Sequence, residues 1–261
     1  MRKIYCLLVP LFLLVSFSGA AEWVNLTNAA EPVQVNLMES NGQEIIVNYQ
    51  LSGFSRDQIE LNGATFDLIG LSGESRLWDK ASPDLPRLCR SIIIPNDGIM
   101  AVRIVSAEYQ DVSGVKVIPS KGHLLRTVNP EEVPYEFGPV YQEDAWYPGN
   151  IAELRTPYVM RDLRGQVIEL NTFQYNPVTE TLRVYTDITV AVSKIAPGGE
   201  NVLLREGDLE VVNRHFNTIY KRHFVNYGDE LDYVTCEEEG TMLIICHDPW
   251  VACVQPLADW K

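Results

Sequence analysis

The chain has 261 residues, of which 46% are hydrophobic, and it carries a formal net charge of −14. A hydrophobic content of this size is typical of a globular protein with one sizeable core or two modest ones, and it excludes a disordered chain. The excess of acidic residues makes nucleic acid and anionic membrane surfaces poor partners.

Residues 1–20 have the pattern of a secretory signal peptide. Two basic residues precede an apolar run at 4–17, and small residues lead up to Ala20. About fourteen apolar residues fall short of the roughly twenty that a transmembrane helix needs. We therefore predict export from a bacterial cell, cleavage after Ala20 or Ala21, no stable membrane span after removal, and a secreted or cell-surface location. The remaining chain keeps 19 Lys and Arg against 35 Asp and Glu, a net charge of −16.

Short apolar segments separated by turn residues follow from Glu31 to about Ser193. In Leu182–Val192 the even-numbered positions form one face, apolar except for Thr186, and this alternation predicts a strand with one buried face. Residues 176–180 supply a turn, so Val167–Tyr175 is predicted to be the partner strand of an antiparallel hairpin. Weaker strands are predicted at Val33–Met38, Glu44–Leu51, Gln58–Leu61, Met100–Val105 and Val115–Ile118. Together these strands indicate a β-sandwich or a related roll.

A proline-rich excursion extends from Pro119 to Pro157. Each proline removes a backbone donor, so no regular strand ladder is expected here. Long excursions from a compact β-domain are often functional. An irregular cover over a sheet edge is an equally good interpretation of the same residues.

After Pro197-Gly198-Gly199 the hydrophobic period becomes helical. An amphipathic helix is predicted between Asp208, as N-cap, and the basic residues 221–223, which complement the helix dipole. Its apolar stripe consists of Val212, Phe216, Ile219, Tyr220 and His223.

The last twenty residues, MLIICHDPWVACVQPLADWK, have the pattern of the start of an α/β domain. Met242–Cys246 is predicted to be a buried strand, Asp248 an N-cap and Pro249 the first helical residue. One strand and one helix cannot bury their apolar faces alone. We therefore expect the protein to continue beyond Lys261.

No catalytic, metal or cofactor site is predicted in the chain. Cys246 and His247 are adjacent on a predicted strand, where neighbouring side chains point to opposite faces, so they cannot act as nucleophile and base. The Cys and His residues lack zinc-ligand spacing, and no phosphate-binding glycine loop occurs. Two functions remain open: a pro-segment that chaperones or inhibits an enzyme, and a non-enzymatic secreted or cell-surface β-sandwich binding module.

Three segments resemble the precursors of gingipain-type cysteine endopeptidases, peptidase family C25. They are ASPDLPRLCRSIIIP (residues 81–95), RGQVIELNTFQYNPVTETLRVYTDITVAV (164–192) and the final MLII…LADWK. The resemblance implies a mostly β fold: a β-sandwich-like prodomain, a helix, and the first βα unit of a truncated caspase-like α/β catalytic domain. The corresponding divisions are a signal peptide at 1–20, the prodomain at 21–197, a helical connector at 198–240 and the start of the catalytic domain at 241–261.

The resemblance also implies a zymogen whose prodomain binds and inhibits its own downstream protease domain. Protein substrates would then be bound by the full-length enzyme, which in this family cleaves after Arg or Lys. The catalytic His and Cys would lie beyond Lys261, so the present chain alone is expected to be inactive. A basic prodomain residue is expected to fill the specificity pocket: Arg126 is the candidate on position, and its rivals are Arg155, Arg161 and Arg164. The candidate processing sites are Arg205 and Arg222.

Overall fold

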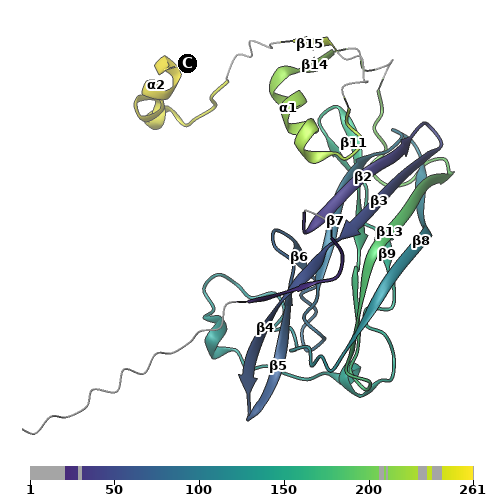
Figure 1. Ribbon diagram of the computed structural model, residues 1–261. Coiled ribbons are helices and arrows are strands. Elements are labelled where there is room, and N and C mark those ends of the chain that lie inside the picture. Colours follow the sequence, from purple (N-terminus) through teal and green to yellow (C-terminus); the bar gives the residue numbers. More distant parts are fainter. Residues whose placement is uncertain are drawn as a thin grey trace, which may run out of the picture.

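Figure 1 shows the computed structural model, in which residues 21–28, 31–205, 209, 211–228, 234–236 and 243–260 are described. Ala20 and Asp208 lie outside these residues. The strands are β1 Glu22–Asn25, β2 Val33–Ser40, β3 Glu44–Leu51, β4 Gly53–Leu61, β5 Ala64–Gly70, β6 Ser75–Arg76, β7 Pro86–Ile93, β8 Ile99–Ser113, β9 Ala152–Leu154, β10 Tyr158–Met160, β11 Leu163–Leu170, β12 Phe173–Asn176, β13 Thr181–Ala196, β14 Val211–Asn213 and β15 Val234–Cys236. The helices are α1 Arg214–His223 and α2 Val251–Trp260, with short 3-10 turns at Pro130–Glu132, Pro139–Gln142 and Asp248–Trp250.

One sheet is organised around β13, the longest described strand. β8 pairs antiparallel with β13 along most of its length, from Thr181 to Ala196. On the other edge, β12 pairs with the first part of β13 and β3 with the second, and β2 extends the sheet beyond β3. The predicted alternation is confirmed, because the even-numbered residues from Leu182 to Val192 are all buried.

A second sheet is built on β7 and β11, which pair antiparallel and are flanked by β6, β9 and β10. The predicted hairpin strand Val167–Tyr175 was wrong as a single element, because it divides between the two sheets. Residues up to Leu170 belong to β11, whereas Phe173 begins β12 against β13. Asn171 lies between the two strands, and its side-chain amide donates to the carbonyl of Asn150 at 2.8 Å. The segment therefore links the two layers of the sandwich.

The third sheet has the strand order β1-β4-β5, and its central strand β4 follows β3 directly in the sequence. Gly53 begins β4, directly against β1: a Cβ atom at this position would lie 2.1 Å from the carbonyl oxygen of Val24. Only glycine allows this close approach. In Figure 1, β4 and β5 extend toward the end of the molecule opposite α1.

The main core lies between these sheets and consists of their inward-facing aliphatic and aromatic side chains. Phe54 and Phe173 meet edge to face in it, with ring centroids 5.8 Å apart. The predicted strand Val115–Ile118 also contributes to this core, but it is not a strand. It forms one isolated parallel bridge, between Val117 and Asp67, on the edge of β5 that faces away from β4.

A smaller core packs α1 against β10 and β11. It contains Leu163, Val212, Tyr220, Phe224 and Tyr227. The helix begins after Asn213, whose side chain accepts hydrogen bonds from the backbone N–H groups of residues 215 and 216. It is therefore shorter than the sequence predicts, because residues 211–213 form β14, parallel to β15.

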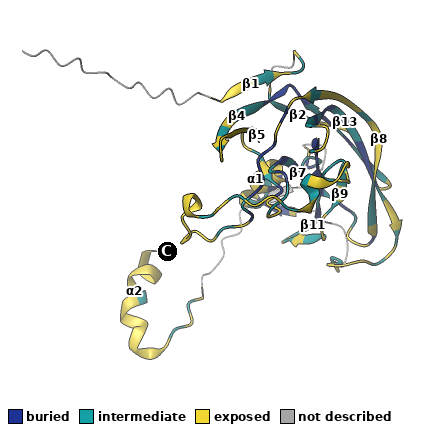
Figure 2. Cartoon of the chain, turned by 90° about the horizontal axis from the view of Figure 1, so that it is seen from below, coloured by how far each residue is buried: buried dark blue, intermediate teal, exposed yellow. Residues whose placement is uncertain are grey.

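The C-terminal segment has little packing. Leu243 and Ile245 are 83% and 88% exposed, so the buried strand predicted at Met242–Cys246 is wrong over its described part. No strand in the described part of the chain pairs with this segment, and its apolar side chains consequently remain uncovered. Asp248 is the first residue of a 3-10 turn rather than an N-cap, and α2 follows with Pro256 inside it and no buried residue. Figure 2 shows how exposed this helix is.

Among the described helices, none has the length and apolar character that a bilayer crossing requires.

The β13 alternation can be tested with two isoleucines on the same strand. Ile188 is 0% exposed and Ile195 is 64% exposed. We expect Ile188→Ala to lower the free energy of unfolding by about 2–5 kcal/mol, because it leaves a cavity in the main core. Ile195→Ala should change it by less than about 0.5 kcal/mol. Urea denaturation measures both values, and equal effects would contradict the assigned faces.

Candidate functional site

The prediction that the proline-rich excursion contains no regular strand is wrong at its end, where Ala152–Leu154 form β9 and pair with β11. The first part of the excursion forms an exposed loop, residues 121–137, whose base is fastened to the segment that precedes β7. Ala81 donates its backbone N–H to the carbonyl of Ser120 at 3.0 Å, and Ser120 donates to Ser82 at 2.8 Å. On the returning side, Gly138 donates to Ala81 at 2.8 Å. Both ends of the loop are thus held by one neighbouring segment, while the residues between them project from the sandwich.

Arg126 lies at the tip of this loop. The backbone N–H of Val128 donates to the carbonyl of Leu125 at 2.9 Å and closes a turn in which Arg126 is a central residue. Leu125 is 75% exposed, and Arg126 is exposed as well. The turn therefore presents the guanidinium group to solvent.

Two side chains brace the loop behind the turn. Lys121 donates from Nζ to the carbonyl of Pro130 at 2.7 Å and lies 4.2 Å from the ring centroid of Tyr135. Asn129 caps the 3-10 turn Pro130–Glu132 by accepting from the backbone N–H of Glu131 at 3.1 Å. The two flanks of the Arg126 turn are consequently tied together.

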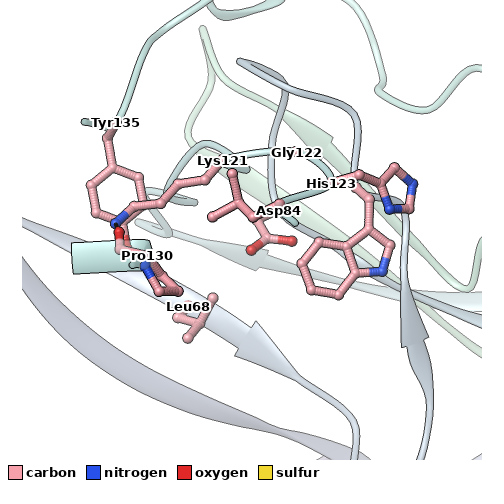
Figure 3. Close-up of a pocket in the computed structure, with 9 residues that line it drawn as sticks. Leu68, Asp84, Lys121, Gly122, His123, Pro130 and Tyr135 are labelled. Atoms are coloured by element: carbon pink, nitrogen blue, oxygen red, sulfur yellow. Dashed lines mark hydrogen bonds between the residues drawn. The ribbon is translucent and has the colours of Figure 1, made fainter. Parts of the chain in front are cut away.

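A mostly apolar groove of about 420 Å³ lies beside the loop, and Figure 3 shows the side chains that line it. Trp78 and His123 form one wall, with ring centroids 5.8 Å apart. Burial raises the pKa of Tyr135, and the nearby negative charge of Asp84 raises it further. The complete lining is Leu68, Trp78, Asp84, Lys121, Gly122, His123, Leu124, Pro130 and Tyr135. Sequence reasoning missed this groove, because Leu68, Trp78 and Tyr135 are far apart in the chain and share no motif.

Two of the rival arginines are engaged on the sandwich. Arg155 forms an ion pair with the buried carboxylate of Glu169, at 2.5 Å. The guanidinium of Arg161 lies 4.6 Å from the ring centroid of Phe216. Arg155 follows β9, whereas Arg161 is exposed in the two-residue turn between β10 and β11.

Arg164 is also unlike Arg126, because it is 0% exposed. It donates to the carbonyls of Pro95, Gly98, Glu200 and Asn201 at 2.7–3.0 Å. Burial lowers its pKa, although the nearby Asp97 acts in the opposite direction. Its guanidinium group therefore satisfies backbone carbonyls inside the fold and is not available at the surface.

The two candidate processing sites lie on different elements. Arg205 follows the end of the sandwich and donates to the backbone carbonyl of Asp162. Arg222 is an exposed residue in the last turn of α1. Neither location tests the predicted cleavage, which remains a prediction.

The described residues contain no group of His, Cys, Asp and Glu that could hold a metal ion. Cys89, Cys246 and Cys253 are free thiols. Cys246 is half-buried, and His247, which is exposed, packs its ring against Trp250 with centroids 5.8 Å apart. The candidate site consists of the Arg126 loop and the groove beside it.

The family model Propeptide_C25 matches residues 25–233. The chain belongs to this propeptide family. This C25 propeptide is 32% identical to Gingipain R1 of Porphyromonas gingivalis over 256 residues, which cover 97% of the chain and 25% of that relative. It is 31% identical to Gingipain R2 of the same species, covering the whole chain and 35% of the relative. The propeptide chain therefore spans about a quarter to a third of the length of these relatives.

The fold is also similar to that of two solved structures. The propeptide matches a chain of the complex of P. gingivalis RgpB pro- and mature domains with a TM-score of 0.67 and 34% identity, over 74% of the propeptide chain and 97% of the other. A structure described as giving insight into the zymogenic latency of gingipain K from P. gingivalis matches with a TM-score of 0.58 at 20% identity, over 68% of the propeptide chain and 100% of the other, which supports the fold alone.

The brace on the Arg126 turn can be tested by replacing Lys121. Lys121→Met removes a hydrogen bond and a cation–π contact, each contributing about 1 kcal/mol. We expect amide hydrogen exchange at Val128 to accelerate roughly tenfold, because the loop opens more often. Lys116→Met is the matched control, since the Lys116–Glu180 ion pair lies outside the loop. Unchanged exchange at Val128 would show that Lys121 does not brace the turn.

Proposed function

We propose that this C25 propeptide is the intramolecular inhibitor and folding chaperone of an exported cysteine endopeptidase. Membership of the propeptide family, the gingipain relatives and the RgpB complex of pro- and mature domains support this proposal. The observation that carries it is the exposed and braced turn bearing Arg126. These findings favour the propeptide over the alternative of a non-enzymatic binding module.

Inhibition follows from the chemistry of a protease that cleaves after Arg or Lys. Such an enzyme needs an acidic specificity pocket, and the guanidinium group of Arg126 is the arginine side chain of this chain best placed to enter one. A turn that is already braced loses little conformational entropy when it binds. A folded domain held over the cleft keeps protein substrates out until cleavage removes it.

Arg126 is favoured over its rivals because its side chain is available. Arg164 would have to leave four backbone carbonyls in order to enter another protein, and such buried groups are costly to leave unpaired. Arg155 would have to abandon the buried carboxylate of Glu169. Among the described residues, no ion pair or hydrogen bond of the Arg126 side chain has to be broken.

The remaining parts of the proposal concern organisation and location. We propose a signal peptide at 1–20, a prodomain at 21–197, a connector at 198–240 and the start of the protease domain at 241–261, with processing at Arg205 or Arg222. The partner is the protease domain of the same precursor, and protein substrates are bound by the full-length enzyme. We place the mature protein outside the cell, either secreted or at its surface.

The inhibitory role of Arg126 is tested by titrating the cognate C25 protease domain with propeptide variants. We expect Arg126→Ala to raise the inhibition constant about a hundredfold, which corresponds to about 2.7 kcal/mol. Arg126→Lys should retain more of the potency, because it keeps the positive charge.

Arg103→Ala is the matched control. Arg103 is an exposed arginine on β8 that is paired with Glu44, and it lies outside the loop. Its replacement should leave the inhibition constant unchanged. Equal potency of Arg126→Ala and the wild-type chain would remove Arg126 from the inhibitory site.

A further inference from the structure

Residues 198–205, which we call the strap, run from the end of β13 back across the sandwich. Two backbone hydrogen bonds tie the strap to the loop that follows β7. Gly98 donates to the carbonyl of Gly198 at 2.9 Å, and Leu203 donates to the carbonyl of Asn96 at 2.9 Å. The strap is therefore part of the folded unit.

Arg164 on β11 is the centre of this attachment. Its guanidinium donates to two strap carbonyls, those of Glu200 at 2.7 Å and Asn201 at 3.0 Å. It also donates to Pro95 and Gly98, at 2.9 Å each, in the loop after β7. One buried side chain thus holds two chain segments together, and the fork of an arginine can do this where the point charge of a lysine cannot.

Contacts on either side of Arg164 complete the attachment. The Asn201 side chain donates to the carbonyl of Pro157 at 2.6 Å, and Gly198 donates to the Asp97 carboxylate at 2.6 Å. The hydrogen bond from the Gly198 backbone is the main reason that the pKa of Asp97 is lowered. At the far end, Arg205 donates to the carbonyl of Asp162. Both the backbone of the strap and the side chain of its final arginine are engaged.

An endopeptidase binds its substrate as an extended segment, so a segment whose backbone is hydrogen-bonded to a folded domain must first open locally. Cleavage after Arg205 therefore depends on how often the strap leaves the sandwich. The Arg126 turn is different, because it is exposed and projects from the fold. A protease can therefore reach Arg126 directly, whereas it can reach Arg205 only after local opening of the strap.

We propose that Arg164 is a clasp that holds the strap on the sandwich and thereby shields the peptide bond after Arg205 from arginine-specific proteases. This inference deepens the proposed function, since its biological role rests on Arg205 being a processing site. The clasp itself is a property of the propeptide alone. Release of the strap, rather than the presence of an arginine, then decides when this bond is cut.

The test uses the full chain and an arginine-specific serine endopeptidase as the probe, with cleavage at Arg205 and Arg126 followed separately by mass spectrometry. Synthetic peptides covering residues 200–211 and 122–132 give the intrinsic rate at each bond. In the wild-type chain we expect cleavage after Arg205 to be at least about a hundredfold slower than cleavage of the matching peptide. The rate of cleavage after Arg126 should lie within about tenfold of the rate for its own peptide.

Arg164→Met should accelerate cleavage after Arg205 by at least about tenfold, while the rate after Arg126 changes less than about twofold. Asn201→Ala loosens the strap without uncovering the carbonyls held by Arg164: it removes the side-chain contact with Pro157 and adds backbone strain, because Asn201 has a φ of 52°. It should give a smaller acceleration, at Arg205 alone. Arg103→Met is the matched control and should change neither rate.

The proposal is overturned if wild-type Arg205 is cut as fast as its peptide, or if neither variant changes the ratio of the two rates. Equal acceleration at both bonds in Arg164→Met would indicate global unfolding, and Asn201→Ala then decides the outcome. Because the probe is a foreign protease, these results do not depend on whether Arg126 inhibits the cognate enzyme. A failure of the clasp is thus distinguishable from a failure of the inhibitory role.

Discussion

The burial of one face of β13 is the constraint on which the structure depends. This strand has β8 along one edge and shares its other edge between β12 and β3, so it fixes the register of three neighbouring strands at once. Its buried side chains form a large part of the main core. The second sheet packs against this one in the main core, and the Arg126 loop and the strap are fastened to segments beside β7 and β11 of that second sheet.

The arginines of the chain illustrate how a framework gives one residue type several roles. Arg126 lies on a turn whose flanks are braced, Arg155 neutralises a buried carboxylate, and Arg164 satisfies backbone carbonyls in the interior. The side chains have the same chemistry, and exposure and partners alone separate them. An exposed arginine with few partners in its own fold is therefore the better candidate for binding another protein.

Local patterns in the sequence predicted the strands that alternate clearly and the presence of α1. They could not show that Val167–Tyr175 divides between two sheets, because the division at Asn171 depends on partners distant in sequence. Position alone singled out Arg126 as the candidate inhibitory residue; it lies on an exposed turn, and its role stays a prediction. The groove beside it and the clasp at Arg164 carried no sequence signal, since their residues meet only through the tertiary fold.

The small core under α1 holds this helix on the sandwich independently of the peptide chain that connects them. Phe224 stacks on Tyr158 of β10, with an interplanar angle of 10°, and Tyr220 donates through its hydroxyl to the Met160 carbonyl at 3.2 Å. These contacts do not pass through the backbone near residue 205. A chain nicked in the strap would thus keep its helix docked as a two-fragment assembly, and the lifetime of that assembly would be set by aromatic packing rather than by the broken peptide bond.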